Sequence, residues 1–250
     1  MTTLPLVGAV AVVSGASSGI GWATARALSA QGAKTLVLAR RIDRLTELVD
    51  VIGADGGQAS AYEVDVADAA GVERVMRAIG EEHGHIDVLV NNAGFLANGP
   101  ALGADLSDWH RMMDINVGGV LNLTHAALPY VVSAATGSRG VADIVNVSSV
   151  AGRRVPSSSS NVYAASKHAV VAFSEALRQE LSSKQVRVGL IEPGVVRTEM
   201  TTGEAKNAPD ATTGRPLNPD DVAGAITYMV TQPPHAAVNE ILLRPTEQVI

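Results

Sequence analysis

A tyrosine and a lysine stand four residues apart in the segment Tyr163-Ala-Ala-Ser-Lys167, within a pattern typical of a helix. This spacing places both side chains on one face of the helix. The pKa of a free phenol is about 10, but a neighbouring ammonium, and the positively charged nicotinamide of an oxidised cofactor, favour the phenolate and lower that pKa. Tyr163 then becomes usable for general acid–base catalysis, which contributes roughly 10²–10⁴ in rate. The alternative, and the commoner case for such a pair alone, is an ordinary pair of helix residues.

Several short polar motifs accompany this pair in the sequence. Ser148 and Ser149 end the apolar run 144–147, and Asn116 lies within a long helical pattern. Asn91-Asn92-Ala93-Gly94 follows one apolar run, and Pro193-Gly194 follows another. Tyr163 and Lys167 are therefore not isolated candidates.

A glycine-rich turn follows the first apolar run, in Ser14-Gly15-Ala16-Ser17-Ser18-Gly19-Ile20-Gly21. Glycines permit a tight turn and a close approach to a pyrophosphate, and the helix that follows presents free N–H groups. The spacing departs from the G-x-G-x-x-G fingerprint, and a glycine-rich turn without a ligand is the alternative. Its position between the first strand and the first helix favours a dinucleotide site formed by Gly15, Ser17, Ser18, Gly19 and Ile20.

The end of the second apolar run distinguishes between two dinucleotides. An NAD-binding fold usually has an acidic residue there, whereas this chain has Ala39-Arg40-Arg41. Because a guanidinium pairs with a 2′-phosphate that an acid would repel, Arg40 and Arg41 predict NADP(H). Either arginine could instead cap the surface of the next helix. Asp65 and Val66, after the third run, are placed at the adenine; a helix-capping acid is the alternative for Asp65.

Apolar runs alternate with helical patterns that would position these motifs. The predicted strands cover residues 7–13, 35–39, 59–64, 86–90, 144–147, 186–191 and 241–243. The predicted helices cover residues 21–31, 41–52, 68–82, 106–132, 162–183 and 219–231. Nearly all-apolar strands between helices indicate a parallel sheet covered on both faces. We therefore expect an α/β fold, a Rossmann-type doubly wound parallel sheet of about seven strands flanked by helices on both faces, in a single domain over residues 1–250.

The order and spacing of these motifs resemble the short-chain dehydrogenase/reductase family over residues 7–245, nearly the whole chain. The resemblance implies that Tyr163 exchanges a proton with the substrate oxygen, and that Lys167 lowers the Tyr163 pKa and binds the nicotinamide ribose. Ser149 would hold the substrate oxygen and stabilise the charge that develops there. Asn116 would support a water that links Lys167 to solvent. Ser149 is preferred to Ser148 because the family's catalytic serine directly precedes a Val-Ala-Gly-like turn.

The same resemblance implies the activity and further cofactor contacts. The chain would be an NADP(H)-dependent oxidoreductase that interconverts a secondary alcohol and a carbonyl, with carbonyl reduction favoured. The C-terminal segment resembles a subgroup with 3-hydroxy acid dehydrogenases and clavulanate dehydrogenase-like members, without fixing the substrate. A non-catalytic NADP(H) sensor or a non-redox family member is the alternative. Asn92, Ala93 and Gly94 would line the ribose region on the adenine side, and the nicotinamide and its carboxamide would contact Pro193, Gly194, Val196 and Thr198.

Two segments break the alternation, namely residues 153–161, which contain a short serine-rich polar loop, and residues 194–218. Residues 194–218 are rich in Thr, Gly and Pro and predict a substrate loop or lid, with plain surface irregularity as the alternative. Arg153 and Arg154 follow the catalytic serine, and either could meet a substrate carboxylate or have a structural role. A moderately apolar substrate is expected, against walls formed by Phe95, Leu96, Val155, Val195 and Met200.

Composition excludes several classes of partner. The net charge of −6 and the pI near 5.5 give no general attraction to nucleic acid or anionic membranes, and 3% aromatic residues suit base stacking poorly. With no cysteine and no histidine in metal-site spacing, we expect no disulfide and no metal, in a reducing cytoplasm. The first apolar run is too short to span a bilayer. The family resemblance implies a homotetramer or homodimer that acts on a small-molecule carbonyl or alcohol.

Overall fold

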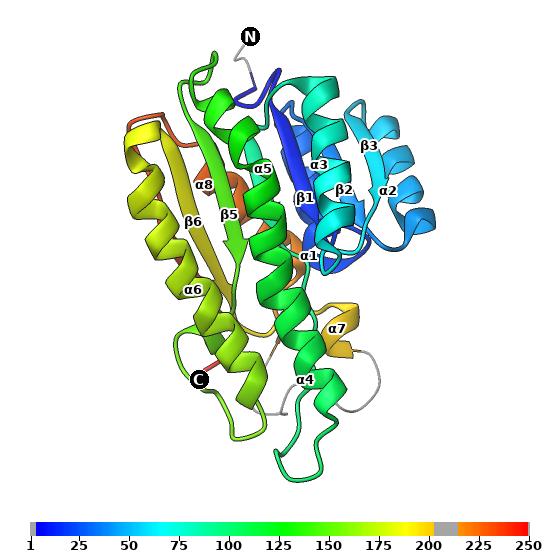
Figure 1. Cartoon of the computed structure of the whole chain (residues 1–250), viewed down its shortest axis with the longest axis vertical. Helices are drawn as coiled ribbons and strands as arrows, with labels where there is room; N and C mark the ends of the chain where they lie inside the picture. Colours follow the sequence, from blue (N-terminus) through cyan, green and yellow to red (C-terminus); the bar gives the residue numbers. More distant parts are fainter. Residues whose placement is uncertain (1–3, 203–214, 250) are drawn as a thin grey trace.

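The computed structural model describes residues 4–202 and 215–249, and its central element is a seven-stranded sheet (Figure 1). The strands are β1 (Val10–Ser14), β2 (Lys34–Ala39), β3 (Gln58–Glu63), β4 (Val88–Asn91), β5 (Ala142–Val147), β6 (Val186–Pro193) and β7 (Glu240–Leu243). Their order is β3-β2-β1-β4-β5-β6-β7, and every neighbouring pair is parallel. The predicted Rossmann-type parallel sheet is confirmed.

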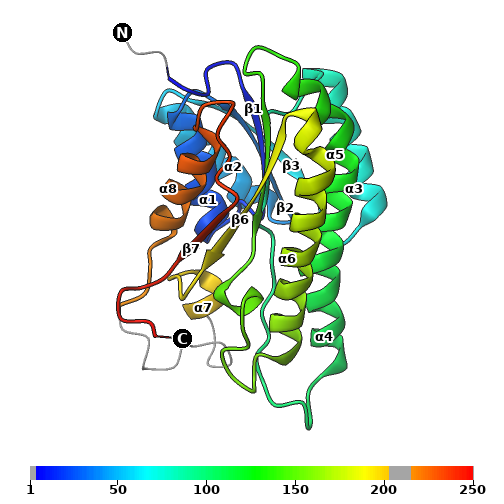
Figure 2. The same ribbon diagram turned by 90° about the vertical axis from the view of Figure 1, so that its left-hand side faces the viewer.

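Helices cover both faces of this sheet (Figure 2). One face carries α1 (Gly19–Ala30), α2 (Ile42–Ala54) and α8 (Pro219–Val230). The other carries α3 (Ala69–His83), α5 (Gly119–Ala135) and α6 (Asn161–Leu181). Two further helices, α4 (Leu106–Met113) and α7 (Glu199–Thr202), lie toward the carboxyl ends of the strands. The loops that follow the strands therefore gather along one edge of the sheet.

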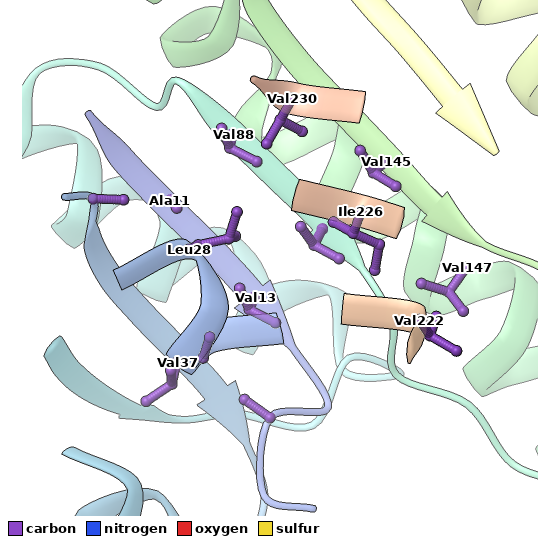
Figure 3. Packing of buried hydrophobic residues seen from close by; sticks show 14 of the residues in the cluster. Ala11, Val13, Leu28, Val37, Val88, Val145, Val147, Val222, Ile226 and Val230 are labelled. Atoms are coloured by element: carbon purple, nitrogen blue, oxygen red, sulfur yellow. The ribbon is translucent and has the colours of Figure 1, made fainter. Parts of the chain in front are cut away.

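Apolar side chains between the sheet and the helices form two large clusters, one on each face. In the first, Val13 and Val88 of the sheet pack with Leu28 of α1 and with Val222 and Ile226 of α8 (Figure 3). All five side chains are fully buried. Burial of one such side chain stabilises the fold by roughly 1.5–3 kcal/mol. The apolar runs in the sequence are thus the strands that hold the loops of the carboxyl edge in place.

The continuous helix predicted over residues 106–132 is interrupted in the structure. α4 ends at Met113, a π-helical turn η1 covers Asp114–Gly118, and α5 begins at Gly119. Within this turn, the Asn116 Oδ1 accepts a hydrogen bond from the Phe95 N–H at 2.7 Å, and its Nδ2 donates to the Phe95 carbonyl at 2.9 Å. Such π-turns are frequent at functional sites. Here the turn lets an amide side chain hold the loop that follows β4.

Two other differences from the prediction concern short segments. The first strand begins at Val10 rather than at residue 7, because residues 5–8 form a turn that ends at Gly8 with a φ of +80°. The end of the helix predicted over residues 162–183 is the separate element η3 (Ser182–Lys184), and the elements α7 and η2 (Val150–Gly152) were not predicted. Each is too short to show a helical period in the sequence.

The stretch Leu106–Ala135 is long and apolar enough to cross a membrane by length and composition alone, with a mean hydropathy of 1.2 in its most apolar window. Core helices of soluble proteins pass the same test. In this fold, α5 packs against β4, β5 and α3, and Leu123, Ala127 and Val131 are buried. α5 is thus the part of this stretch that forms a helix layer on the sheet.

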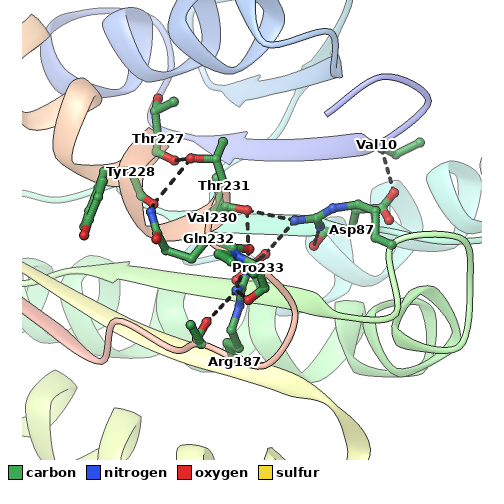
Figure 4. A network of polar contacts seen from close by, with 12 residues as sticks. Val10, Asp87, Arg187, Thr227, Tyr228, Val230, Thr231, Gln232 and Pro233 are labelled. Carbon is green, nitrogen blue, oxygen red and sulfur yellow. Dashed lines mark hydrogen bonds and ion pairs between the residues drawn. The ribbon is translucent and has the colours of Figure 1, made fainter. Parts of the chain in front are cut away.

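A buried ion-pair network holds the amino ends of the strands together. Arg187 of β6 donates from Nε and Nη2 to the two carboxylate oxygens of Asp143 in β5, at 2.7 and 3.0 Å. Arg139 donates to Asp143 at 3.1 Å and to the carbonyl oxygen of Val230, at the C-terminal end of α8, at 2.8 Å. Figure 4 shows Arg187 beside this helix end. This network thus lies at the edge of the sheet opposite the predicted site.

The connections between strands diverge at β1, whose neighbours are β2 and β4. From β1 the chain passes to β2 on one side, and from β4 it passes to β5 on the other. In open parallel sheets, ligands bind in the crevice at the carboxyl ends of the strands where this reversal occurs. The glycine turn, directly after β1, lies at this position.

Candidate active site

A cleft at the carboxyl ends of the strands extends from the residues after β2 to those after β6. It brings together every predicted cofactor residue and three of the four predicted catalytic residues. The fourth, Asn116, does not line it. Those that do are Gly15, Ser17, Ser18, Gly19, Ile20, Arg40, Arg41, Asp65, Val66, Asn92, Ala93, Gly94, Ser149, Tyr163, Lys167, Pro193, Gly194, Val196 and Thr198.

The turn between β1 and α1 has the backbone geometry of a phosphate site. Gly15 has a φ of +64°, and a Cβ there would lie 2.8 Å from the Cα of Ala93, so only glycine fits. α1 begins at Gly19, and its N-cap residue Ser18 makes no capping hydrogen bond with its side chain. The first N–H groups of α1 therefore lack a capping side chain, and the helix dipole favours an anion beside them. This donor set fits the pyrophosphate of a dinucleotide.

Ser14 and Asn92 hold the glycine turn against the end of β4. The Ser14 hydroxyl accepts hydrogen bonds from the N–H groups of Asn92 and Ala93 at 3.0 and 3.2 Å. The Asn92 amide donates to the carbonyl oxygens of Ser14 and Gly15 at 2.9 and 3.3 Å. Asn92 lines the cleft as predicted, but its side chain stabilises the turn. The sequence signal for this role is a polar residue at the end of each of two apolar runs.

Both arginines after β2 border the cleft, and each has an acidic partner. Arg41 donates from Nε and Nη2 to the Ser17 hydroxyl at 3.2 and 3.0 Å, and its Nη2 lies 3.0 Å from the Glu199 carboxylate. Arg40 lies 3.7 Å from the Asp65 carboxylate. This corner of the cleft thus presents guanidinium and hydroxyl donors, which are the groups that bind a 2′-phosphate. Glu199 was not predicted as a site residue.

Asp65 reaches the cleft and also contributes to local structure. Its Oδ1 accepts a hydrogen bond from the Ala67 N–H at 3.0 Å, in the turn that precedes α3. The N-cap residue of α3 is Asp68. The helix-capping alternative for Asp65 is therefore wrong, and its contact with an adenine stays a prediction.

Tyr163 and Lys167 lie one turn apart on α6 and both border the cleft. Lys167 is buried, and its Nζ donates to the carbonyl oxygen of Val147 at 2.9 Å. The same Nζ lies 5.8 Å from the centroid of the Tyr163 ring. Ser149 lies close enough to Tyr163 to lower the pKa of that phenol. A phenol, a hydroxyl and an ammonium thus share one wall of the cleft.

The pKa of Tyr163 in the protein alone is raised, and its lowering beside an oxidised nicotinamide stays a prediction. Burial raises this pKa above its ordinary value of 10.0, and the nearby Ser149 side chain lowers it by less. Burial also lowers the pKa of Lys167 from 10.5 to about 8. Lys167 was predicted to lower the Tyr163 pKa, but its ammonium is held at Val147 and does not offset the effect of burial. At neutral pH the protein alone therefore presents a neutral phenol, which is a proton donor.

The two serines after β5 have different surroundings. The Ser149 Oγ donates to the carbonyl oxygen of Pro193 at 3.5 Å, in addition to its contact with Tyr163. Ser148 is buried, and its hydroxyl donates to the carbonyl oxygen of Lys167 at 3.2 Å. Both serines line the cleft, and the preference for Ser149 as the catalytic serine stays a prediction.

Asn116 lies behind the cleft and is 1% exposed. Besides its two bonds to Phe95, it donates from Nδ2 to the Ser166 hydroxyl at 3.0 Å, and Ser166 donates to the Tyr163 carbonyl at 2.7 Å. Asn116 thus connects the loop after β4 to the turn of α6 that carries Tyr163. Its part in a water link to Lys167 stays a prediction.

A chain of buried amides and hydroxyls lies beneath the cleft and was not predicted. The Asn91 Nδ2 donates to the Asn146 Oδ1 at 2.8 Å and to the Thr124 hydroxyl at 2.9 Å. The Asn146 Nδ2 donates to the Ser174 hydroxyl at 2.8 Å. These bonds fix β4, β5, α5 and α6 relative to one another. The sequence signal for them is an asparagine in, or directly after, two apolar runs.

Arg153 and Arg154 both have partners within the protein. The Arg153 Nε lies 2.8 Å from both carboxylate oxygens of Glu192, which is fully buried, and its Nη2 pairs with Glu240. Arg154 donates to the carbonyl oxygen of Val249 at 3.2 Å. Of the two alternatives for these arginines, the structure favours the structural role.

The predicted lid over residues 194–218 is described in part, since 203–214 lie outside the described residues. Residues 194–202 contribute α7 and several residues of the cleft. Within the part of the chain that the structure describes, no group of three or more His, Cys, Asp or Glu could hold a metal ion. Among the expected apolar walls, the cleft is lined by Phe95 and Met200 but not by Leu96, Val155 or Val195.

Known proteins resemble this chain over nearly its full length. A family model described as short chain dehydrogenase matches residues 9–209. Sulfoacetaldehyde reductase 2 of Chromohalobacter salexigens is 40% identical over 247 residues, which cover 96% of this chain and 95% of that protein. Glycine betaine reductase ATRR of Emericella nidulans is 38% identical over 251 residues, and this chain spans 19% of its length. The closed form of serine dehydrogenase complexed with NADP+ superposes with a TM-score of 0.85 at 35% identity, covering 96% of each chain.

Proposed function

This chain belongs to the short-chain dehydrogenase family and is an NADP(H)-dependent oxidoreductase, and from this premise we propose that it interconverts a secondary alcohol and a carbonyl compound, chiefly by reducing the carbonyl. One observation carries the proposal. A glycine turn, two arginines and a neutral tyrosine border a single cleft. The first two features bind a phosphorylated dinucleotide, and the third supplies a proton.

The cleft residues fit the two phosphate-bearing parts of NADP(H). The first N–H groups of α1 would hold the pyrophosphate, and Ser17, Arg40 and Arg41 would hold the 2′-phosphate. The segment from Pro193 to Thr198 borders the cleft and would contact the nicotinamide. Bound NADPH supplies the hydride, while the protein supplies orientation and the proton.

Tyr163 gives this proton to the substrate oxygen. Because burial raises its pKa, Tyr163 is a neutral phenol at neutral pH and can protonate the oxygen of a carbonyl that is being reduced. Ser149, close to Tyr163, holds the same oxygen and stabilises its negative charge. Lys167 is largely charged below its pKa of about 8, and its charge stabilises the phenolate that remains after proton transfer.

The substrate, assembly and location belong to the same proposal. The substrate is a small, moderately apolar carbonyl compound that lies against Phe95 and Met200. Residues 1–250 act as one domain, in the cytoplasm, as a homotetramer or homodimer joined through α4, α5 and α6. Support for the assembly comes from exposed apolar side chains on α4 and α5, namely Leu106, Met113 and Leu121. Support for the location comes from the absence of cysteine.

A screen of ketones and aldehydes, read by nicotinamide absorbance, tests this function. We expect at least one compound to be reduced, and Tyr163→Phe to lower kcat/KM by roughly 10²–10⁴ while NADPH still binds. Tyr228→Phe is the matched control, since this phenol is exposed on α8 and does not line the cleft. Full turnover by Tyr163→Phe would contradict the assignment. NADPH binding without turnover of any compound would favour an NADP(H) sensor.

A further inference from the structure

The guanidinium of Arg41 is shared between the glycine turn and the segment that follows β6. Its Nε and Nη2 donate to Ser17, and the same Nη2 lies 3.0 Å from the Glu199 carboxylate. Glu199 is the first residue of α7. The preceding residue, Thr198, also contacts the glycine turn, because a Cβ on Gly19 would lie 3.0 Å from the Thr198 Cγ2. The start of α7 is therefore placed against the corner of the cleft where a 2′-phosphate would bind.

The ion pair between Arg41 and Glu199 is one that a phosphate can displace. The two side chains are 47% and 56% exposed, and exposed ion pairs contribute little to stability. A phosphate monoester carries about −1.5 to −2 charges and three acceptor oxygens. It therefore binds a guanidinium more strongly than a carboxylate does, and it repels a carboxylate at the same position.

Asp65 is not in an equivalent position. Its distance from Arg40 is longer, at 3.7 Å, and its carboxylate is also held by the Ala67 N–H in its own turn. Glu199 is instead held to this corner of the cleft by Arg41. Of the two acidic residues here, Glu199 is the one whose release would free a guanidinium.

We propose that Glu199 is a specificity-determining residue whose carboxylate competes with the 2′-phosphate of NADP(H) for the guanidinium of Arg41. The proposal rests on the proposed function, which assigns Arg41 to that phosphate. NADPH must displace the carboxylate, whereas NADH has no 2′-phosphate and leaves the pair intact. Glu199 thus weakens the preference for NADP(H) over NAD(H). It also couples the release of α7 from Arg41 to the presence of the phosphate.

Dissociation constants for NADPH and NADH, measured by fluorescence titration of the full chain, test this competition. Glu199→Gln should bind NADPH about two- to fivefold more tightly than the wild type, since an exposed ion pair no longer has to be broken. Its affinity for NADH should not change. The gain should shrink as ionic strength rises, because salt screens exposed charges.

Glu47→Gln is the matched control for loss of one negative charge. Glu47 lies on α2 and pairs with Arg44 at 2.6 Å, not with Arg41. Glu47→Gln should therefore change neither the affinity for NADPH nor the affinity for NADH. A general effect of net charge would instead tighten NADPH binding in both variants and would overturn the proposal.

Arg41→Gln, alone and combined with Glu199→Gln, separates the proposal from its premise. If Arg41→Gln leaves NADPH affinity unchanged, the phosphate assignment in the proposed function fails, and the competition fails with it. If Arg41→Gln weakens NADPH binding but Glu199→Gln binds NADPH no more tightly than the wild type, the phosphate assignment stands. Only the proposed competition between Glu199 and the 2′-phosphate then fails. In the double variant, Glu199→Gln should no longer tighten NADPH binding relative to Arg41→Gln alone. Tighter binding that persists in the double variant would also overturn the proposal.

Discussion

Lys167 contacts the end of β5 more closely than it contacts Tyr163. Its Nζ donates to the Val147 carbonyl at 2.9 Å but lies 5.8 Å from the centroid of the Tyr163 ring. Burial lowers its pKa to about 8, so the charge available to stabilise a Tyr163 phenolate is lost just above neutral pH. The buried ammonium also has a cost to folding that depends on pH.

Lys167→Met should change how stability depends on pH. Between pH 8 and 10.5 the unfolded chain keeps a lysine proton that the folded wild type has lost, so this group adds stability as the pH rises. Below pH 8 the full cost of the buried charge, up to about 3 kcal/mol, is present. Urea unfolding of both proteins at about pH 7 and about pH 9.5 checks this. The free energy of unfolding of the wild type should rise relative to that of the variant at the higher pH. A difference between the two proteins that does not change with pH would contradict this prediction.

Gly15→Ala should abolish NADPH binding, whereas Gly56→Ala should not. Both glycines have a positive φ, of +64° and +82°, so both substitutions introduce the same kind of backbone strain. At Gly15 the new Cβ would also lie 2.8 Å from the Ala93 Cα, whereas at Gly56 it would meet nothing within 4 Å. Fluorescence titration with NADPH measures the difference. Similar affinities in the two variants would show that the turn tolerates a side chain.

Arg187→Met should lower the free energy of unfolding without changing NADPH affinity. The substitution leaves the buried Asp143 paired with Arg139 alone. Removing one partner of a buried ion pair costs about 3 kcal/mol or more in the free energy of unfolding. NADPH affinity is preserved because the network lies at the amino ends of the strands. Arg178→Met is the control, since the Arg178–Glu175 pair on α6 is exposed and its loss should matter little. Equal urea midpoints for the two variants would be the contrary result.

Arg153→Met should destabilise the protein, and a second substitution should recover much of the loss. Without Arg153, the fully buried carboxylate of Glu192 has lost its guanidinium partner, which costs roughly 3–5 kcal/mol. Arg153→Met combined with Glu192→Gln removes the charge together with its partner. Thermal unfolding of the single and double variants measures the recovery. If the double variant is less stable than Arg153→Met, the charge of Glu192 is not the cause.

The strands and the glycine turn were predictable because their physical requirements are local. β1 and β5 are buried along their whole length, so they appear as apolar runs in the sequence. Gly15 needs a positive φ and space for Ala93, which only glycine allows. The tyrosine–lysine spacing was equally local, because one turn of α6 places both side chains at the cleft.

Other features could not be predicted because they depend on contacts between distant segments. Glu199 meets Arg41, and Glu192 meets Arg153, only after β2, β6 and the loop following β5 have been assembled. The π-turn at Asn116 covers only five residues between two α-helices, so it was not predicted. The raised pKa of Tyr163 depends on burial, which its spacing from Lys167 does not reveal.

The ion pairs of Arg187 and Asp143 lie at the rim of the sheet opposite the cleft. The stability that this network contributes is therefore encoded by residues that do not line the cleft. Loops on the cleft side, such as residues 94–105, could therefore be exchanged with those of related enzymes to change which substrates are accepted while this network is kept. Substitutions among the residues that line the cleft can therefore change which ligand binds without removing these ion pairs.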